Sequence, residues 1–286
     1  MRLGVHVSIA GGLLEALERA NRLSCGTIQI FSRSPRGGPA PALPPDDLAR
    51  FQQGVREADY VPLVVHAPYI LNLAAPDATV YQRSLALYRE EYRRCLLIGA
   101  SYLVTHVGSH RGEGEEAGIA RVAAAVDKTL AAAPEGVMVL LENTAGSGQG
   151  LGYSFEQLAA MREQMTERKR VGICLDTAHL FASGYAIHTA DGLEDTVAKC
   201  DAVLGLSHVK LIHLNDSKVA FNSRVDRHWH IGEGHIGREA MERIVNQPRL
   251  RDLPWILETP KDSDDDDLRN LATVRALRGQ RSAVAA

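Results

Sequence analysis

The stretch VGICLDTAH, residues Val171–His179, combines a short apolar run with polar side chains at its end. Seven similar runs, rich in apolar and β-branched residues, are each followed by a turn and a stretch of helical period. The eight runs are Leu3–Ser8, Thr27–Ser32, Pro62–Tyr69, Tyr102–Ser109, Val137–Thr144, Val171–His179, Val209–Asp216 and Trp255–Pro260. Apolar strands that alternate with helices are typical of a parallel sheet covered by helices.

The helical stretches between these runs complete the repeating unit. They include Leu13–Leu23, Thr79–Ile98, Ile119–Ala132, Phe155–Met165, Leu193–Leu204 and Arg238–Asn246. Eight strand–helix units in 286 residues match the count and length of a (β/α)8, or TIM, barrel. We therefore predict an α/β fold, with a single barrel domain over residues 1–286.

A doubly wound sheet is the main alternative fold. It is disfavoured because no G-x-G-x-x-G turn follows the first predicted strand and no linker divides the chain. The proline-rich stretch Pro35–Pro45 reads as a long loop after the second strand rather than as a domain boundary.

Composition narrows the class of protein further. A net charge of -3 argues against a generally basic surface, although it allows a local positive groove. The four cysteines have no C-x-x-C spacing, which is typical of reduced thiols in a cytosolic protein. The sequence shows no signal segment and no apolar run of about 18 residues. We expect a cytoplasmic protein with no membrane contact.

Nine potential metal ligands fall at the predicted carboxyl ends of strands or in the loops just beyond. They are His66, His106, Glu142, Asp176, His179, His213, Asp226, His228 and Glu258. Taken singly, each is more simply a core or surface polar residue. In a barrel, however, these strand ends converge on the face where active sites are built. Nine ligands are enough for about three four-coordinate sites if a carboxylate is shared.

Other histidines have weaker assignments. His6 ends the first predicted strand and His110 follows His106 by four residues. Both are candidates for supporting the ligands or contacting substrate, with structural packing as the alternative. His230 and His235 flank the Asp226-x-His228 loop and could orient its ligands through hydrogen bonds.

Eight motifs together resemble the endonuclease IV family of apurinic/apyrimidinic (AP) endonucleases over essentially the whole chain. They are HVSIAGG (His6–Gly12), HAPYILNLA (His66–Ala74), HVGSH (His106–His110), ENTAGSG (Glu142–Gly148), DTAH (Asp176–His179), HLNDSK (His213–Lys218), SRVDRHWHIGEGHIG (Ser223–Gly237) and ETP (Glu258–Pro260). The resemblance implies a DNA-repair hydrolase whose trinuclear zinc cluster cleaves double-stranded DNA on the 5′ side of abasic sites. It also implies trimming of blocked 3′ ends.

The resemblance further implies how the nine ligands are shared among three Zn2+ ions. His66, His106 and Glu142 match one ion, and His179, Asp226 and His228 match another. A third set comprises Glu142, Asp176, His213 and Glu258. Ligands that are rich in histidine and free of thiolate suit zinc, with Mn2+ as the alternative at the carboxylate-rich set. Water activated between two cations can attack phosphorus, so no side-chain nucleophile is required. We expect Glu142 and Glu258 to matter most for catalysis.

By position, Tyr69, Ile70 and Arg36 match family residues that insert into the DNA helix where a base is missing. Separating the stacked bases costs the least free energy where a base is already missing. The loop RSPRGGPAP departs from the family pattern, because it lacks the asparagine that commonly precedes Pro-Arg and the aromatic residue that commonly follows. A plain surface loop is the alternative for this segment. We expect the chain to act as a monomer.

Two other function classes remain. A sugar isomerase or epimerase barrel also places carboxylates and a histidine on this rim for two metals, but His66 and the Asp226-x-His228 pair are surplus to that chemistry. A catalytically inactive DNA-binding barrel would be expected to lack a bridging carboxylate, whereas Glu142 and Glu258 are both present.

Overall fold

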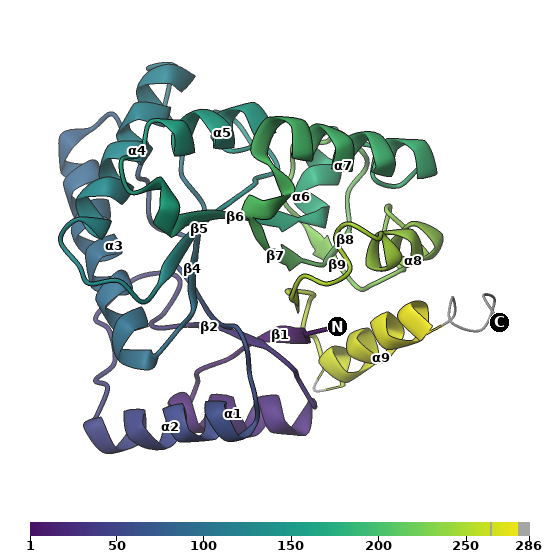
Figure 1. Cartoon of the computed structure of the whole chain (residues 1–286), viewed down its shortest axis with the longest axis horizontal. Coiled ribbons are helices and arrows are strands. Elements are labelled where there is room, and N and C mark those ends of the chain that lie inside the picture. The colour runs from purple at the N-terminus through teal and green to yellow at the C-terminus, as the bar shows by residue number, and fades with distance from the viewer. Residues whose placement is uncertain (264, 280–286) are drawn as a thin grey trace.

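The computed structural model describes residues 1–263 and 265–279, and the rest of the predicted 1–286 domain lies outside this description. Eight parallel strands close into a barrel in the order β1-β10-β7-β6-β5-β4-β3-β2 (Figure 1). They are β1 Leu3–Val7, β2 Ile28–Phe31, β3 Leu63–His66, β4 Tyr102–Thr105, β5 Met138–Glu142, β6 Val171–Asp176, β7 Val209–His213 and β10 Trp255–Leu257. The predicted (β/α)8 barrel is confirmed.

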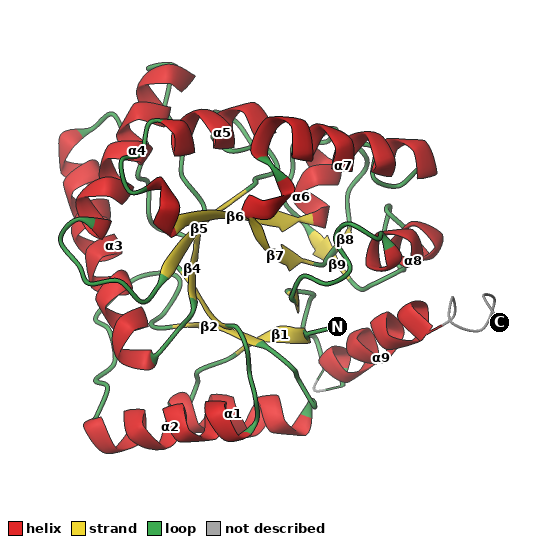
Figure 2. Ribbon diagram, in the orientation of Figure 1, coloured by secondary structure: helices red, strands yellow, loops and turns green. Residues whose placement is uncertain are grey.

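Helices surround the barrel on its outside (Figure 2). They are α1 Leu13–Arg22, α2 Pro45–Glu57, α3 Ala78–Ile98, α4 Glu115–Leu130, α5 Phe155–Glu163, α6 Thr177–Ser183, α7 Ala190–Leu204, α8 Arg238–Asn246 and α9 Asp266–Gly279. Two short 3-10 turns, Arg168–Arg170 and Leu206–His208, precede β6 and β7. A small antiparallel hairpin, formed by β8 Asp216–Ser217 and β9 His228–Trp229, lies in the long connection after β7.

Several strands end earlier than predicted. The run Pro62–Tyr69 leaves the sheet at His66, and the run Val171–His179 leaves it at Asp176. After β6 the cause is local, because the Asp176 side chain accepts a hydrogen bond of 2.8 Å from the His179 amide and caps helix α6. His179 therefore lies on a helix and not on a strand.

The segment after β2 contains a helix that was not predicted. The proline-rich loop ends at Pro44, and α2 begins with Pro45 in its first turn. Proline is favoured there because its missing N–H would have no partner within the helix. Phe51 on α2 is fully buried and fixes the helix against the barrel.

The barrel has two apolar layers. A compact interior group comprises one residue from each of six strands, Val64, Val104, Leu140, Cys174, Leu211 and Ile256, all fully buried. A much larger cluster fills the space between the strands and the surrounding helices. Because side chains alternate between the two faces of a strand, the interior group fixes which residues of each strand point into the barrel.

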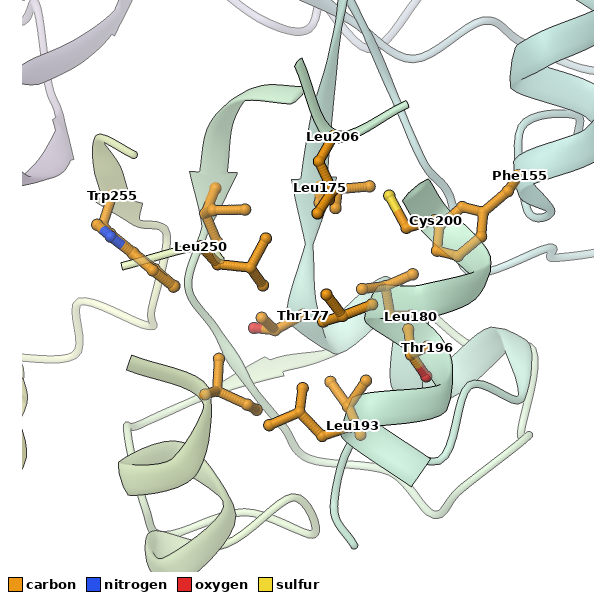
Figure 3. A pocket seen from close by; sticks show the side chains of 14 residues that line it. Phe155, Leu175, Thr177, Leu180, Leu193, Thr196, Cys200, Leu206, Leu250 and Trp255 are labelled. Atoms are coloured by element: carbon orange, nitrogen blue, oxygen red, sulfur yellow. The ribbon is translucent and has the colours of Figure 1, made fainter. Parts of the chain in front are cut away.

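Packing between β6, β7 and helices α7 and α8 leaves one small enclosed space (Figure 3). Its volume is about 20 Å³, and apolar side chains such as Leu175, Leu193 and Trp255 line it. That space admits about one water molecule but offers little hydrogen bonding, so it is a packing defect and not a ligand site. Within the described residues, no helix is long and apolar enough to cross a membrane.

Candidate metal centre

The alternation of side chains along the strands brings most of the predicted ligands to one layer at the rim. On four strands, and one residue beyond the end of two others, a candidate ligand lies two residues after the apolar residue that points into the barrel. The pairs are Val64 and His66, Val104 and His106, Leu140 and Glu142, Cys174 and Asp176, Leu211 and His213, and Ile256 and Glu258. The barrel interior thus sets the direction of six of the nine side chains.

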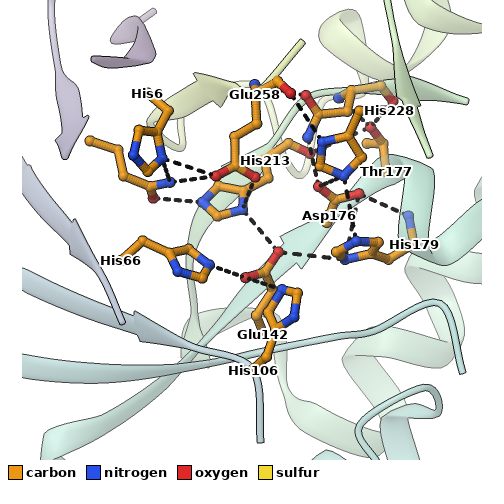
Figure 4. A network of polar contacts seen from close by, with 12 residues as sticks. His6, His66, His106, Glu142, Asp176, Thr177, His179, His213, His228 and Glu258 are labelled. Carbon is orange, nitrogen blue, oxygen red and sulfur yellow. Dashed lines mark hydrogen bonds and ion pairs between the residues drawn. The ribbon is translucent and has the colours of Figure 1, made fainter. Parts of the chain in front are cut away.

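Glu142 lies at the middle of this layer and is fully buried (Figure 4). The Nε2 atoms of His66 and His106 each lie 3.1 Å from its Oε2. On the other side, its Oε1 lies 3.0 Å from Nδ1 of His213. Each carboxylate oxygen therefore faces a separate set of imidazoles, as a carboxylate that bridges two cations would.

A second set of ligand atoms surrounds His213. Its Nδ1 lies 3.1 Å from Oε2 of Glu258 as well as close to Glu142. Glu142, Asp176, His213 and Glu258 each offer an atom within 4.8 Å of the others. This set is rich in carboxylates.

A third set forms where α6 meets the hairpin after β7. Oδ1 of Asp226 lies 3.2 Å from Nε2 of His179 and 3.4 Å from Nε2 of His228. The two histidine Nε2 atoms are themselves 3.4 Å apart. Oδ2 of Asp176 also lies 3.5 Å from His228 Nε2, so Asp176 stands between the second and third sets. All nine predicted ligands are thus brought together.

The remaining ring nitrogens show that these histidines fit a metal. Nδ1 of His66, His179 and His228 lie 2.7, 2.9 and 3.1 Å from the backbone carbonyls of Ala67, Asn143 and Glu258. A carbonyl can only accept, so these Nδ1 atoms donate, and whenever the ring is neutral its Nε2 keeps the lone pair. Those Nε2 atoms are the ones that point at the carboxylates, which is the arrangement of neutral histidine ligands for zinc.

The close contacts between carboxylates and imidazoles shift the pKa values of groups in the centre. Burial raises the pKa of the Glu142 carboxyl, but His106 and His213 beside it lower the pKa by more, to well below its usual range. Burial lowers the pKa of His179, yet the nearby Asp176 and Asp226 raise it well above the usual range. The centre therefore requires positive charge among its carboxylates, held either as protons or as metal ions.

These directions predict how metal-free protein responds to pH. The raised pKa of His179 stabilises the fold fully below its ordinary value of 6.5, and this contribution is lost as pH rises through the folded value. The lowered pKa of Glu142 stabilises the fold above 4.5 and is lost as pH falls. For metal-free protein, these groups should favour folding most between those values.

Zinc binds deprotonated ligands, so the increase in Tm caused by zinc should grow from about pH 5 to pH 8. Thermal melts with chelator and with zinc across that range measure this increase. An increase that stays constant across the range would contradict the assignment of His179.

Three supporting amides were missed by the sequence analysis. The side-chain amide of buried Gln29 on β2 donates a hydrogen bond of 2.6 Å to Oε1 of Glu258. The Oε1 atom of Gln29 lies 2.8 Å from Nε2 of His213. The side-chain amide of Asn215 donates a hydrogen bond of 2.7 Å to Oδ2 of Asp176. Asn143 bonds the backbone of Asp176 in both directions. Gln29 had a visible signal, since it is a polar residue within an apolar strand.

The other candidate histidines lie in different surroundings. Nδ1 of His6 is 3.3 Å from Oε1 of Glu258, so His6 contacts a predicted ligand directly. His110 instead accepts hydrogen bonds from the amides of Gly112 and Gly114, within its own loop. Its role at the site stays a prediction. His230 is held by Asn270 on α9, and His235 is exposed.

A groove of about 570 Å³ opens beside the centre and includes His106, His179 and Asp226 in its lining. Tyr69 and Ile70 line it as well and remain 57% and 52% exposed. The Tyr69 ring lies 5.4 Å from the ring of His66 and 5.9 Å from that of His106. Tyr69, which is predicted to insert into DNA, therefore lies directly beside two of the candidate metal ligands.

The loop that carries Arg36 lies against Ile70. A Cβ atom at Gly37 would stand 2.7 Å from Cδ1 of Ile70, and the positive φ of 92° at this position also favours glycine. Arg36 itself is exposed. The start of the loop is held by buried Glu91 on α3, which accepts a hydrogen bond of 2.6 Å from the Ser32 hydroxyl and also pairs with Arg33. The predicted contact of Arg36 with DNA stays a prediction.

Comparison with known proteins agrees with the barrel fold. Residues 17–280 match the family described as xylose isomerase-like TIM barrel. A D-tagatose 3-epimerase-like protein shares the fold with a TM-score of 0.74, at 19% identity and over 100% of both chains. Fold and ligand set together define a barrel of the xylose isomerase-like class.

Within that class, the chain belongs to the endonuclease IV family. "Probable endonuclease 4" of Chloroflexus aurantiacus is 45% identical over 96% of this chain and 98% of the relative. The protein of the same name from Methanoculleus marisnigri is 44% identical over 97% of this chain and 99% of the relative. The crystal structure of endonuclease IV from Thermus thermophilus matches with a TM-score of 0.87, at 35% identity, over 98% of this chain and 100% of that chain.

Proposed function

We propose that this protein is a DNA-repair endonuclease that hydrolyses the phosphodiester on the 5′ side of abasic sites and trims blocked 3′ ends. The observation that carries the proposal is the clustering of the nine candidate ligands in three adjoining sets, two of which share Glu142, beside an open groove that the exposed Tyr69 lines. Family membership supports a nuclease, because two relatives named probable endonuclease 4 are 45% and 44% identical to this chain.

We propose three Zn2+ ions per chain, with Mn2+ as an alternative in the set around His213. Bound ions would lower the pKa of a water and neutralise charge on phosphoryl oxygens. The chain contributes the geometry. Glu142 and Glu258 are the proposed catalytic carboxylates, because Glu142 joins two ligand sets while Gln29 and His6 hold Glu258 from behind.

One assay tests the proposal directly. Duplex oligonucleotides that carry a single abasic site should be cut on its 5′ side, while an intact duplex of the same sequence should not. Elemental analysis of the same preparation should find zinc. Absence of cleavage by protein with a full complement of metal would overturn the proposed activity.

Recognition of the abasic site is assigned to Tyr69 and Ile70. Replacing both by alanine should weaken binding to abasic duplex by roughly 1–3 kcal/mol for each base that is no longer stacked. Cleavage of a small phosphodiester that needs no DNA distortion should change little, because neither side chain is a ligand. Binding by fluorescence anisotropy and hydrolysis of both substrates measure the two effects.

Single variants separate recognition from packing. Tyr69→Phe keeps the ring next to His66 and His106, so it serves as the matched control. Ile70→Ala leaves that ring contact intact and should affect the DNA substrate alone. Equal loss on both substrates in the double variant would mean that these residues support the ligands through packing.

A sugar epimerase is the second candidate, because epimerase structures share the fold. Their identity to this chain is low, at 19% for the D-tagatose 3-epimerase-like protein, so the likeness concerns the fold alone. The third set of ligands around His179 is surplus to a two-metal sugar site. Interconversion of a free ketose, without cleavage of abasic DNA, would favour this alternative.

We also propose that the chain works as a single-domain monomer in the cytoplasm. All four cysteines are buried and unpaired within the described residues, in agreement with a reducing compartment. Light scattering with and without abasic duplex would test the oligomeric state.

A further inference from the structure

A buried carboxylate outside the nine ligands organises the segment that follows β9. Asp216 is fully buried, three residues after His213. Its Oδ2 accepts hydrogen bonds of 3.0 Å from the amides of both Gly232 and Gly234. Its Oδ1 accepts one of 2.9 Å from the amide of Ile236. One side chain thus gathers the backbone of the turn 232–237 around itself, as a bound anion would.

The turn is shaped to fit that carboxylate. A Cβ atom at Gly234 would stand 2.5 Å from Oδ1 of Asp216 and 2.4 Å from the carbonyl oxygen of Ser217. Gly234 is not among the residues with positive φ, so the need for glycine here comes from the close approach alone. Gly237 adds a further amide, 3.3 Å from Oδ2.

Asp216 is itself part of the hairpin that carries the candidate ligands Asp226 and His228, because it is the first residue of β8. In the register of β8 and β9, Asp216 pairs with Trp229 and Ser217 pairs with His228. The amide of His235 also donates a hydrogen bond of 2.8 Å to the carbonyl of Ser217, so the turn closes back onto β8. Movement of the turn would therefore move β9 and His228 with it.

We propose that Asp216 is a positioning residue for the third ligand set, His179, Asp226 and His228. By tying the turn 232–237 to β8, it holds the hairpin where Asp226 and His228 reach His179 on α6. His66, His106 and Glu142 lie at or just after the ends of β3, β4 and β5 and do not contact this turn. The inference rests on the proposed trinuclear centre, and it predicts a selective weakening of one of the three ions.

Asp216→Asn tests the inference with almost no change in shape. An asparagine side chain places an N–H2 group where one carboxylate oxygen was, so donor faces donor at the amides of the turn. The affinity for one of three ions should fall by about 10–100-fold, the usual effect of disturbing groups that orient metal ligands. Zinc content after dialysis against graded chelator measures this, and hydrogen exchange of the amides of residues 232–237 should become faster.

Three further variants make the result decisive. Asp127→Asn is the matched control, because Asp127 also accepts from two backbone amides, those of Thr166 and Glu167, but lies on α4. It should keep all three ions. Gly234→Ala should reproduce the selective loss and replaces Asp216→Asn if that variant does not fold. Adding His179→Ala to Asp216→Asn should remove no further ion, because both changes act on the same set of ligands.

Wild-type affinity for all three ions in both Asp216→Asn and Gly234→Ala would overturn the inference, as would an equal loss in Asp127→Asn. If the wild-type chain itself retains fewer than three ions, the proposed trinuclear centre fails. The anchoring role of Asp216 is then decided by exchange of the amides in the turn, where unchanged protection in Asp216→Asn would refute it.

Discussion

Glu142→Ala should reduce cleavage of abasic DNA by at least about 10³-fold, because a single change removes a ligand from two sets at once. In the folded protein, its two oxygens face His66 and His106 on one side and His213 on the other. Alanine would leave these imidazoles without the charge between them, and metal content should fall together with activity. Steady-state cleavage and zinc content per chain measure both effects.

The control for Glu142→Ala is another fully buried glutamate. Glu91 on α3 is equally inaccessible but pairs with Ser32 and Arg33, away from the ligands. Glu91→Gln should lower the Tm while leaving metal content and hydrolysis of a small phosphodiester unchanged. If Glu142→Ala stayed within about tenfold of the normal rate while Glu258→Ala did not, the bridging role would belong to Glu258.

Removal of metal should abolish cleavage and destabilise the fold. An ion present at about 1,000 times its Kd stabilises the folded state by about 4 kcal/mol, since the unfolded chain lacks the site. A change of 1 kcal/mol shifts the Tm by about 2–4 °C in domains of 150–250 residues. Exhaustive chelation should thus lower the Tm near neutral pH by roughly 10 °C or more, as calorimetry would show.

Restoring zinc is the control for chelation. Activity and Tm should both return when zinc is added, and a variant such as His179→Ala should recover less of each. Full cleavage by protein whose metal content has been measured as nil would refute the metal assignment, whatever the behaviour of the Tm.

The sequence by itself determined the barrel and most of the centre. Eight apolar runs at regular intervals define a parallel sheet, because each run can be buried only between neighbours and covering helices. Side chains alternate along a strand, so His66, Glu142 and His213 had to share the face of the apolar residue two positions earlier. Both results depend on periodicity, which a sequence shows directly.

Only the tertiary structure decided which atoms meet. Side chains from β2 and β7 must converge before Gln29 can be seen to bond His213, since 184 positions separate them in the chain. The anchoring of the turn by Asp216 depends in the same way on the close approach of Gly234. His110 shows the converse, because it lies close to His106 in sequence yet bonds its own loop. Such contacts follow from loop conformation and side-chain rotamers, which are fixed by packing between distant segments and leave no periodic signal.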